Sequence, residues 1–174
     1  FLDPNGEGDG SQLAGWCMAQ GETHGYHFGG DVYQRIELSE NGLDCRIVPA
    51  SDPVGEGTYN AAEFTPALIR DGEKIEDSFW TGEQPRACFG TSTQGIYMLV
   101  IEGRYPDEGI RGTSVNTCSD ILLSYGCWNA LNMDGGSSAI LWYDGEYVTQ
   151  SSSSPLRYTG GRPLPNAWVY KKAE

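Results

Sequence analysis

One stretch of this sequence constrains the fold more than any other, because it predicts a strand, a helix and a second strand in that order. Residues 96–101 form a continuous apolar run, which is typical of a strand buried on both faces. Residues 115–125 carry apolar side chains at helical spacing, with Ser114 as the N-cap and Gly126 at the end. Residues 127–133 return to a strand pattern. We expect the two strands to run parallel in one sheet, with the helix connecting them.

The remaining sequence predicts short strands and many turns rather than further helices. The chain of 174 residues contains 24 glycines and 9 prolines, and it is long enough for one domain with a substantial core. Residues 1–30 read as a glycine-rich loop. Further strands are expected at residues 32–38, 44–48, 60–70, 85–90, 139–143, 146–150 and 163–170. We therefore predict a single α+β domain over residues 1–174, with a mixed, largely antiparallel sheet and few helices.

The charge of the chain excludes nucleic acid as a partner. Lys and Arg number 11 and Asp and Glu number 24, which gives a net charge of −13, whereas phosphate backbones require a basic surface. A local group of arginines can still bind a phosphate on a small substrate. The sequence shows neither a membrane span nor a signal peptide.

The cysteines predict an oxidising compartment rather than a metal site. None of the five forms a CxxC pair, and the two histidines lie near only one of them, so a structural zinc site is not expected. We expect a secreted or cell-surface protein with one or two disulfides and at least one thiol left over. Cys118 and Cys127 would be too far apart to bond if both lay on one helix.

A polar motif lies between two apolar stretches of residues 127–142. It contains one amide, one acid, two glycines and two hydroxyls, namely Asn132, Asp134, Gly135, Gly136, Ser137 and Ser138. Glycines let the backbone turn sharply and approach a bound group, and successive N–H groups in such a turn can form an anion nest. An Asp-Gly pair is also a common hairpin turn. The motif alone therefore leaves both a binding site and a plain turn open.

The predicted parallel strands bring further polar residues toward this motif. Both strands would end at the same edge of the sheet, so Glu102 and Arg104 would lie near Asn132 and Asp134. Two nearby carboxylates suit glycoside chemistry, and an arginine binds phosphate or carboxylate through two hydrogen bonds. A surface ion pair between Glu102 and Arg104 is the alternative. Trp residues can stack on sugars, although most tryptophans belong to a core.

Several short motifs occur across residues 60–170 in the order and spacing of a known family. They are NA at 60–61 with PALIRDG at 66–72, PRA at 85–87 with Gly90, EGR at 102–104, NMDGGSSAIL at 132–141, and RP at 162–163 with NA at 166–167. Together they resemble the phosphodiester glycosidase family. The chain departs from the family pattern where Glu102 stands for Asp, Ser137 for a third glycine, and Thr65 for a glycine.

The resemblance implies a phosphodiester glycosidase-like fold and a hydrolase of sugar-1-phosphodiesters of the N-acetylglucosamine-phosphate type. Asp134 and Glu102 would be the acid/base or nucleophile pair. The other implied catalytic residues are Arg104 and Asn132, and the implied substrate-binding residues are Arg86, Gly135, Gly136, Ser137, Ser138, Arg162 and Asn166. No cofactor is implied, and a divalent metal bridging the two carboxylates is not indicated.

The start of the chain and two other functions complete these expectations. Residues 1–6 resemble a segment that follows an upstream family motif, so we expect a domain that lacks its N-terminal part, or obtains it from a separate segment or a second copy of the chain. A glycosidase that cleaves cell-wall or exopolysaccharide linkages without phosphate is one alternative function. A non-catalytic carbohydrate-binding module is the other.

Overall fold

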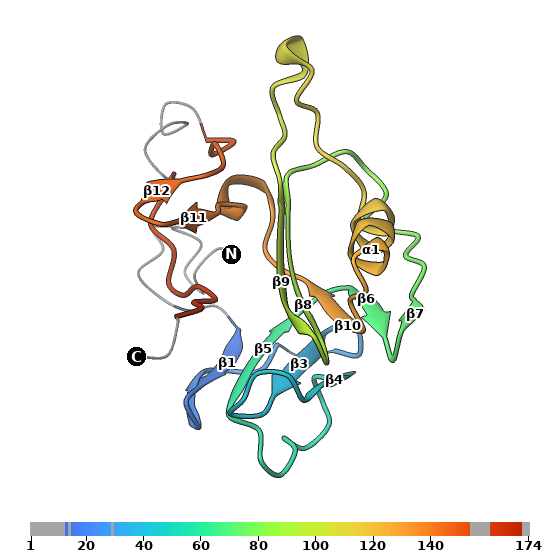
Figure 1. The fold of residues 1–174 in the computed structure, drawn as a ribbon, viewed down its shortest axis with the longest axis vertical. Coiled ribbons are helices and arrows are strands. Elements are labelled where there is room, and N and C mark those ends of the chain that lie inside the picture. The colour runs from blue at the N-terminus through green and yellow to red at the C-terminus, as the bar shows by residue number, and fades with distance from the viewer. Residues whose placement is uncertain (1–12, 14, 29, 154–160, 172–174) are drawn as a thin grey trace.

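The computed structural model describes residues 13, 15–28, 30–153 and 161–171, which form two five-stranded sheets and one α-helix (Figure 1). The first sheet has the order β2-β1-β5-β3-β4. Its strands are β1 (Trp16–Ala19), β2 (Glu22–Gly25), β3 (Gln34–Leu38), β4 (Cys45–Pro49) and β5 (Asn60–Phe64). The second sheet has the order β7-β6-β10-β8-β9. Its strands are β6 (Ala67–Arg70), β7 (Glu73–Lys74), β8 (Arg86–Ser92), β9 (Gly95–Ile101) and β10 (Asn129–Asn132).

The remaining elements are short, and they confirm the predicted fold class. The helix is α1 (Val115–Ser124), and the two 3-10 turns are η1 (Pro106–Glu108) and η2 (Gly136–Ser138). A separate hairpin joins β11 (Trp142–Tyr143) to β12 (Glu146–Tyr147). Every pairing between the described strands is antiparallel, so the chain has an α+β fold built on antiparallel sheets. No helix within the described ranges is long and apolar enough to cross a membrane.

The second sheet lies between the helix and the first sheet. On one face, Val115, Cys118 and Leu122 of α1 pack against a cluster that includes Leu68 and Ile69. On the other face, a second cluster joins the two sheets. Its buried members are Ile36, Leu38, Ile47, Ala67, Phe89 and Leu131. β9 lies at the edge of this sheet and all its residues are half-buried, so the expectation that residues 96–101 are buried on both faces is wrong.

The strand–helix–strand prediction is confirmed, with one strand inserted between the pair. β9 and β10 each pair antiparallel with β8, so they run in the same direction and end at the same edge. Ser114 caps α1 by accepting a hydrogen bond from the Thr117 N–H at 3.2 Å. The chain between β9 and α1 rises as a long arm to η1 before it returns to the helix (Figure 1). The predicted order of strand, helix and strand is therefore confirmed, and β8 lies between β9 and β10 in the sheet.

Two predictions at the ends of the chain are wrong. Residues 16–25, expected as loop, form the β1–β2 hairpin, in which Trp16–Ala19 pairs with Glu22–Gly25. Residues 163–170, expected as a strand, form no strand. Prolines at 163 and 165 cannot donate to a ladder, and Trp168 instead stacks on Phe89 with ring centroids 4.0 Å apart. The closing segment therefore covers the core as a loop.

Buried charges tie a loop to the first sheet. The Arg35 side chain is fully buried, and its Nε donates to Glu37 Oε1 at 2.7 Å. Its other nitrogens donate to the carbonyls of Ala50 and Asp52 at 2.9 and 2.8 Å. Arg46 Nε donates to Glu37 Oε2 at 2.7 Å. A buried charge is tolerated when it is paired and hydrogen-bonded in this way, so the cluster holds residues 50–58 against β3.

This cluster predicts that acid weakens the fold. Burial raises the pKa of the Glu37 carboxyl, but hydrogen bonds from Arg46, Arg35 and Thr58 outweigh burial and hold that pKa below its ordinary value of 4.5. A carboxyl with a lowered folded-state pKa stabilises the protein above the unfolded-state pKa, and this contribution disappears as the pH falls through the folded-state pKa. Denaturant unfolding at pH 7 and at successively lower pH should show a smaller loss of stability in Glu37→Gln than in wild type. An equal loss in both proteins would contradict the prediction.

All five cysteines carry free thiols in this structure, so the expectation of disulfides stays a prediction. Cys88, Cys118 and Cys127 lie in the core between α1 and the second sheet. Burial raises the pKa of the Cys127 thiol to about 12 and that of Cys45 to about 11. These protonated thiols act as small apolar core groups.

Candidate active site

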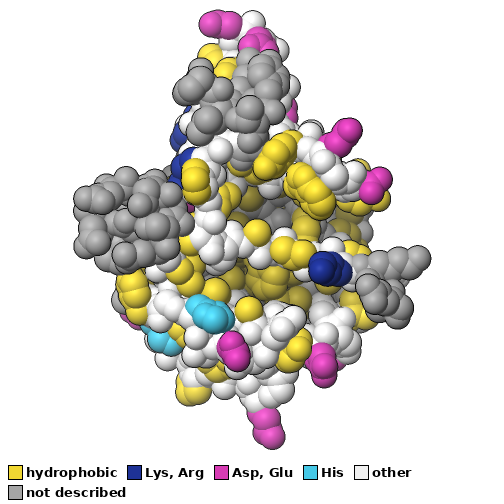
Figure 2. Space-filling view, turned by 90° about the vertical axis from the view of Figure 1, so that its left-hand side faces the viewer, with side chains coloured by type: hydrophobic (Ala, Val, Ile, Leu, Met, Phe, Trp, Pro, Cys, Tyr) yellow, Lys and Arg dark blue, Asp and Glu magenta, His cyan; other side chains and the backbone are white. Residues whose placement is uncertain are grey.

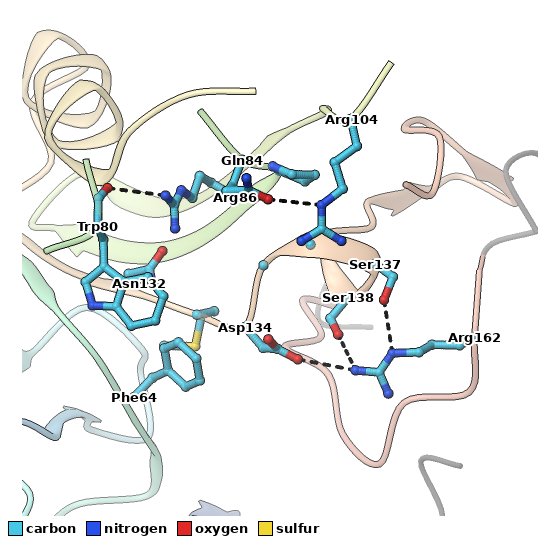
Figure 3. Close-up of a pocket in the computed structure, with 14 residues that line it drawn as sticks. Phe64, Trp80, Gln84, Arg86, Arg104, Asn132, Asp134, Ser137, Ser138 and Arg162 are labelled. Atoms are coloured by element: carbon cyan, nitrogen blue, oxygen red, sulfur yellow. Dashed lines mark hydrogen bonds and ion pairs between the residues drawn. The ribbon is translucent and has the colours of Figure 1, made fainter. Parts of the chain in front are cut away.

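A pocket of about 320 Å³ opens where β9 and β10 end and β8 begins (Figure 3). The register explains why these ends meet, since Arg86 pairs with Ile101 and Cys88 with Asn132. Residues after β9 and β10 therefore converge on the segment that leads into β8. The lining residues are Phe64, Trp80, Gln84, Pro85, Arg86, Arg104, Asn132, Met133, Asp134, Gly135, Gly136, Ser137, Ser138 and Arg162.

The surface around such a pocket matters because the chain is strongly acidic. On the face drawn in Figure 2, acidic side chains are spread singly around the edge, and hydrophobic side chains surround a central hollow. In contrast, three of the residues that line the pocket are arginines and one is an aspartate. The pocket thus concentrates positive charge in a protein of net charge −13.

Asp134 is held by an arginine that is distant in sequence. Arg162 Nη2 lies 3.5 Å from Asp134 Oδ2 and donates to Ser138 Oγ at 2.7 Å. Arg162 Nε donates to Ser137 Oγ at 3.3 Å. Both charged side chains are part-buried, with exposed fractions of 23% for Arg162 and 34% for Asp134. Arg162 therefore links the acid and both hydroxyls of the motif, as the dashed lines in Figure 3 show.

The two glycines are required by close packing. A Cβ at Gly135 would lie 2.5 Å from the Pro85 carbonyl oxygen. Gly136 has φ 56°, and a Cβ there would lie 3.1–3.3 Å from Nη2, Nη1 and Cζ of Arg104. Because these three atoms are almost equally distant, the guanidinium lies with its face over Gly136. The glycines thus let the motif pass between Pro85 and Arg104.

The backbone of this motif differs from the predicted anion nest. The Gly136 N–H donates to Pro85 O at 3.0 Å, and the Ser138 N–H donates to Gly135 O at 3.0 Å. These bonds close the η2 turn and tie it to the start of β8. Two of the four N–H groups expected to bind an anion are therefore already used within the fold. The positive charge in the pocket comes instead from arginine side chains.

Arg104 presents its guanidinium to the pocket. Its Nε donates to Gln84 Oε1 at 3.0 Å, which fixes the orientation of the fork formed by the two terminal nitrogens of the guanidinium. Its two terminal nitrogens make no hydrogen bond to any other described residue. The backbone of Arg104 has φ 71°, in the left-handed region that non-glycine residues rarely adopt. Arg104 therefore offers two N–H-bearing nitrogens for an anion near Asp134 (Figure 3).

Arg86 lines the pocket, but its hydrogen bonds serve the fold. The side chain is buried, and Nε donates to Thr113 O at 3.0 Å. Nη2 donates to Trp80 O at 3.2 Å and to Gly82 O at 2.9 Å. Burial lowers the pKa of this guanidinium from its ordinary value. Arg86 thus holds the 80–82 loop in place and leaves Arg104 as the better candidate for phosphate.

Asn132 is also held by the fold. It is buried, and its Nδ2 donates to Thr65 O at 2.7 Å. Its Oδ1 lies 4.0 Å from the Cys88 Sγ, which donates to it. This amide therefore fixes the backbone beside Phe64 at the wall of the pocket. Its predicted role of orienting a sugar or water stays a prediction.

The structure does not bring Glu102 and Asn166 to the pocket walls. The Glu102 carboxylate accepts a hydrogen bond from the Gln150 N–H, and neither residue belongs to the described lining. Glu102 directly follows Ile101, the last residue of β9. Asn166 is exposed and hydrogen bonds with Cys17 of β1. Glu102 therefore lies outside the described lining that contains Asp134, and the pairing of these two carboxylates stays a prediction.

Five residues of the lining are not among the predicted site residues, namely Phe64, Trp80, Gln84, Pro85 and Met133. Gln84 orients Arg104, while Phe64, Trp80 and Met133 add apolar surface to the wall. Met133 and Pro85 lie within quoted motifs, Gln84 precedes the PRA motif, and Phe64 lies two residues before PALIRDG, so proximity to the motifs was the available signal. Among the described residues, no group of three or more His, Cys, Asp and Glu side chains could hold a metal ion.

The fold and pocket define an α+β domain whose polar pocket holds one carboxylate and is suited to an anionic ligand. The sequence profile of phosphodiester glycosidases matches residues 9–171. The chain therefore belongs to the phosphodiester glycosidase family, a family of hydrolases.

One solved structure shares this fold. The catalytic domain of zebrafish N-acetylglucosamine-1-phosphodiester alpha-N-acetylglucosaminidase, auto-inhibited by its pro-peptide, is similar with a TM-score of 0.65 and 16% identity. The match covers 94% of this chain and 58% of the zebrafish chain, so this chain spans little more than half of that length. A hypothetical protein from Synechocystis has a TM-score of 0.43 and 17% identity, with 79% of this chain and 39% of that chain covered. A search of curated proteins finds no match.

Proposed function

We propose that this protein hydrolyses the glycosidic bond between the C1 atom of a sugar and a phosphodiester. One observation carries the proposal: Asp134 and the free fork of Arg104 line the same pocket, with Arg162 holding the acid. An acid at the sugar carbon and an arginine at the phosphate are the two groups that this reaction needs. The membership of the chain in a glycosidase family supports the same reading.

A pocket with one carboxylate suits this leaving group. Water supplies a hydroxyl to C1, the bond from C1 to the bridging oxygen breaks, and the phosphomonoester leaves with the bond electrons. Asp134 either takes the proton from that water or attacks C1 first, and both roles require an ionised carboxylate. A phosphate leaves readily as an anion, so a second carboxyl that protonates the leaving oxygen is dispensable. The position of Glu102 outside the pocket is consistent with this chemistry.

Arg104 supplies the electrostatic part of the mechanism. Negative charge grows on the phosphate as the glycosidic bond breaks, and a preoriented guanidinium stabilises that charge. Gln84 holds Arg104 through Nε, which leaves the two terminal nitrogens to face the phosphate. Arg162 contributes further positive charge, but its hydrogen bonds to Ser137 and Ser138 assign it mainly to orienting Asp134.

The direct test compares a phosphodiester with a neutral glycoside of the same sugar. Purified protein is incubated with N-acetylglucosamine 1-(methyl phosphate) and with an aryl N-acetylglucosaminide, and released sugar is measured. We expect a higher kcat/KM for the phosphodiester than for the neutral glycoside. Activity that a chelator leaves unchanged would show that no metal takes part. Binding without turnover would identify a carbohydrate-binding module. Faster release from the neutral substrate would favour a glycosidase for linkages without phosphate.

A further inference from the structure

A second pocket of about 200 Å³ adjoins the arginine pocket and differs from it in chemistry. It is lined by Tyr33, Phe64, Thr65, Trp80 and Asp134. Phe64, Trp80 and Asp134 also line the first pocket, so the two pockets are neighbours. Three of the five lining side chains are aromatic. Arg104 and Arg162 border only the first pocket, and Asp134 stands at the boundary between an aromatic side and an arginine side.

Resting on the proposed function, we infer that this second pocket binds the pyranose ring of the substrate by stacking it against aromatic side chains. The phosphate is bonded directly to C1, so a phosphate at Arg104 puts the sugar ring within one bond of it. The acid must face C1, and Asp134 is the one acidic residue among the three that border both pockets. The ring therefore lies on the aromatic side of Asp134. The second ester bond of the phosphate leads the aglycone away from this aromatic side.

The chemistry of a pyranose matches these walls. One face of the ring carries C–H groups and is apolar, while the hydroxyls project around its edge. Aromatic side chains supply large apolar faces with few mobile bonds, so they bind the C–H face at low entropic cost. Thr65 adds one polar residue to this lining.

The aromatic walls are held by the fold before any ligand arrives. Asp77 Oδ1 accepts hydrogen bonds from the Phe79 and Trp80 N–H groups, and the Trp80 carbonyl accepts from Arg86 Nη2 and the Val115 N–H, both at 3.2 Å. Asp77 is fixed to α1 through Asn116, with two hydrogen bonds of 2.9 Å.

The opposite walls are fixed as well. Tyr33 stacks on Phe28 with ring centroids 4.5 Å apart, and Phe64 packs against the core cluster between the sheets. Preorganised walls of this kind lower the cost of ordering the site on binding. Because Arg86 holds the loop of Trp80, it acts here as a positioning residue.

Trp80 gives the sharpest test, because 44% of its surface is exposed and its removal leaves the core intact. The matched control is Phe79, which is adjacent in the same loop, 88% exposed, and absent from the lining of both pockets. The substrates are N-acetylglucosamine 1-(methyl phosphate) and UDP-N-acetylglucosamine, which share the sugar and differ in the aglycone. Inorganic phosphate serves as a competitor for the arginine side.

We expect Trp80→Ala to lower kcat/KM by at least ~10-fold, the scale of losing an aromatic anchor, and by a similar factor on both substrates. Trp80→Phe should recover most of the loss, Phe79→Ala should match wild type, and inhibition by phosphate should not change in Trp80→Ala. Activity of Trp80→Ala within ~3-fold of wild type would overturn the inference. A loss confined to UDP-N-acetylglucosamine would also overturn it, because the aromatic side would then hold the aglycone.

The failure of the proposed function would look different. If the wild-type protein hydrolyses neither substrate, the proposed reaction is contradicted, and the aromatic sugar site is then tested by ligand binding alone. Saturation-transfer NMR with N-acetylglucosamine 1-phosphate then measures contact with the sugar ring protons. Ring contact that disappears in Trp80→Ala supports the aromatic sugar site, and contact that persists, or that never occurs in wild type, contradicts it.

Discussion

Asp134→Asn should lower kcat on a sugar-1-phosphodiester by at least ~10²-fold, the scale of a general base or nucleophile. Asparagine keeps the shape of aspartate and an oxygen that can accept from Arg162, so the η2 turn and the pocket should persist. It lacks the charge that either deprotonates water or attacks C1. Steady-state and single-turnover rates on N-acetylglucosamine 1-(methyl phosphate) measure the effect.

The chain provides a matched control in a second Asp-Gly pair. Asp144 lies in the exposed turn between β11 and β12 and has φ 49°, a conformation that asparagine also adopts. Asp144→Asn should therefore keep both fold and activity. Full activity in Asp134→Asn would mean that the central motif is only a turn, and the proposed reaction would lose its acid. Equal circular dichroism and unfolding curves for the two variants would separate loss of chemistry from loss of structure.

Arg104→Lys should lower kcat/KM on the phosphodiester by ~10²-fold, as expected for loss of a preorganised donor at developing negative charge. Lysine keeps one positive charge but loses the planar fork, and it cannot reproduce the Nε contact with Gln84 while facing a phosphate. Arginine and lysine are equally disfavoured by the left-handed backbone at φ 71°, so the substitution changes the side chain without changing the backbone strain. On a neutral aryl glycoside the loss should be much smaller.

Arg111 is the control for this substitution. It lies on the same arm between β9 and α1, is exposed, and does not line the pocket. Arg111→Lys should leave both substrates unaffected. If Arg104→Lys slows both substrates equally, Arg104 supports the Gly136 turn rather than the phosphate. That outcome would follow from the guanidinium packing over Gly136.

Local pattern was sufficient for the elements that position the site. The apolar run of β9, the capped stripe of α1 and the strand of β10 all occur where the periodicity places them, because each pattern matches one regular backbone geometry. The β1–β2 hairpin was not predicted, since glycine-rich composition concealed a four-residue strand. The closing segment was predicted as a strand from its residue types alone. Its prolines have no N–H group to donate to a neighbouring strand, and the segment forms none.

By itself, the sequence determined the fold class, the family and the presence of Asp134, Arg104 and the two glycines in one region. Only the tertiary structure decided what each side chain is free to do. Arg86 donates to backbone carbonyls through Nε and Nη2, Asn132 donates to the Thr65 carbonyl, and Glu102 accepts from the N–H of Gln150, 48 residues away. Such partners are set by the packing of distant segments, which strand or helix periodicity does not encode. The same packing holds Asp134 against Arg162 and leaves the fork of Arg104 open.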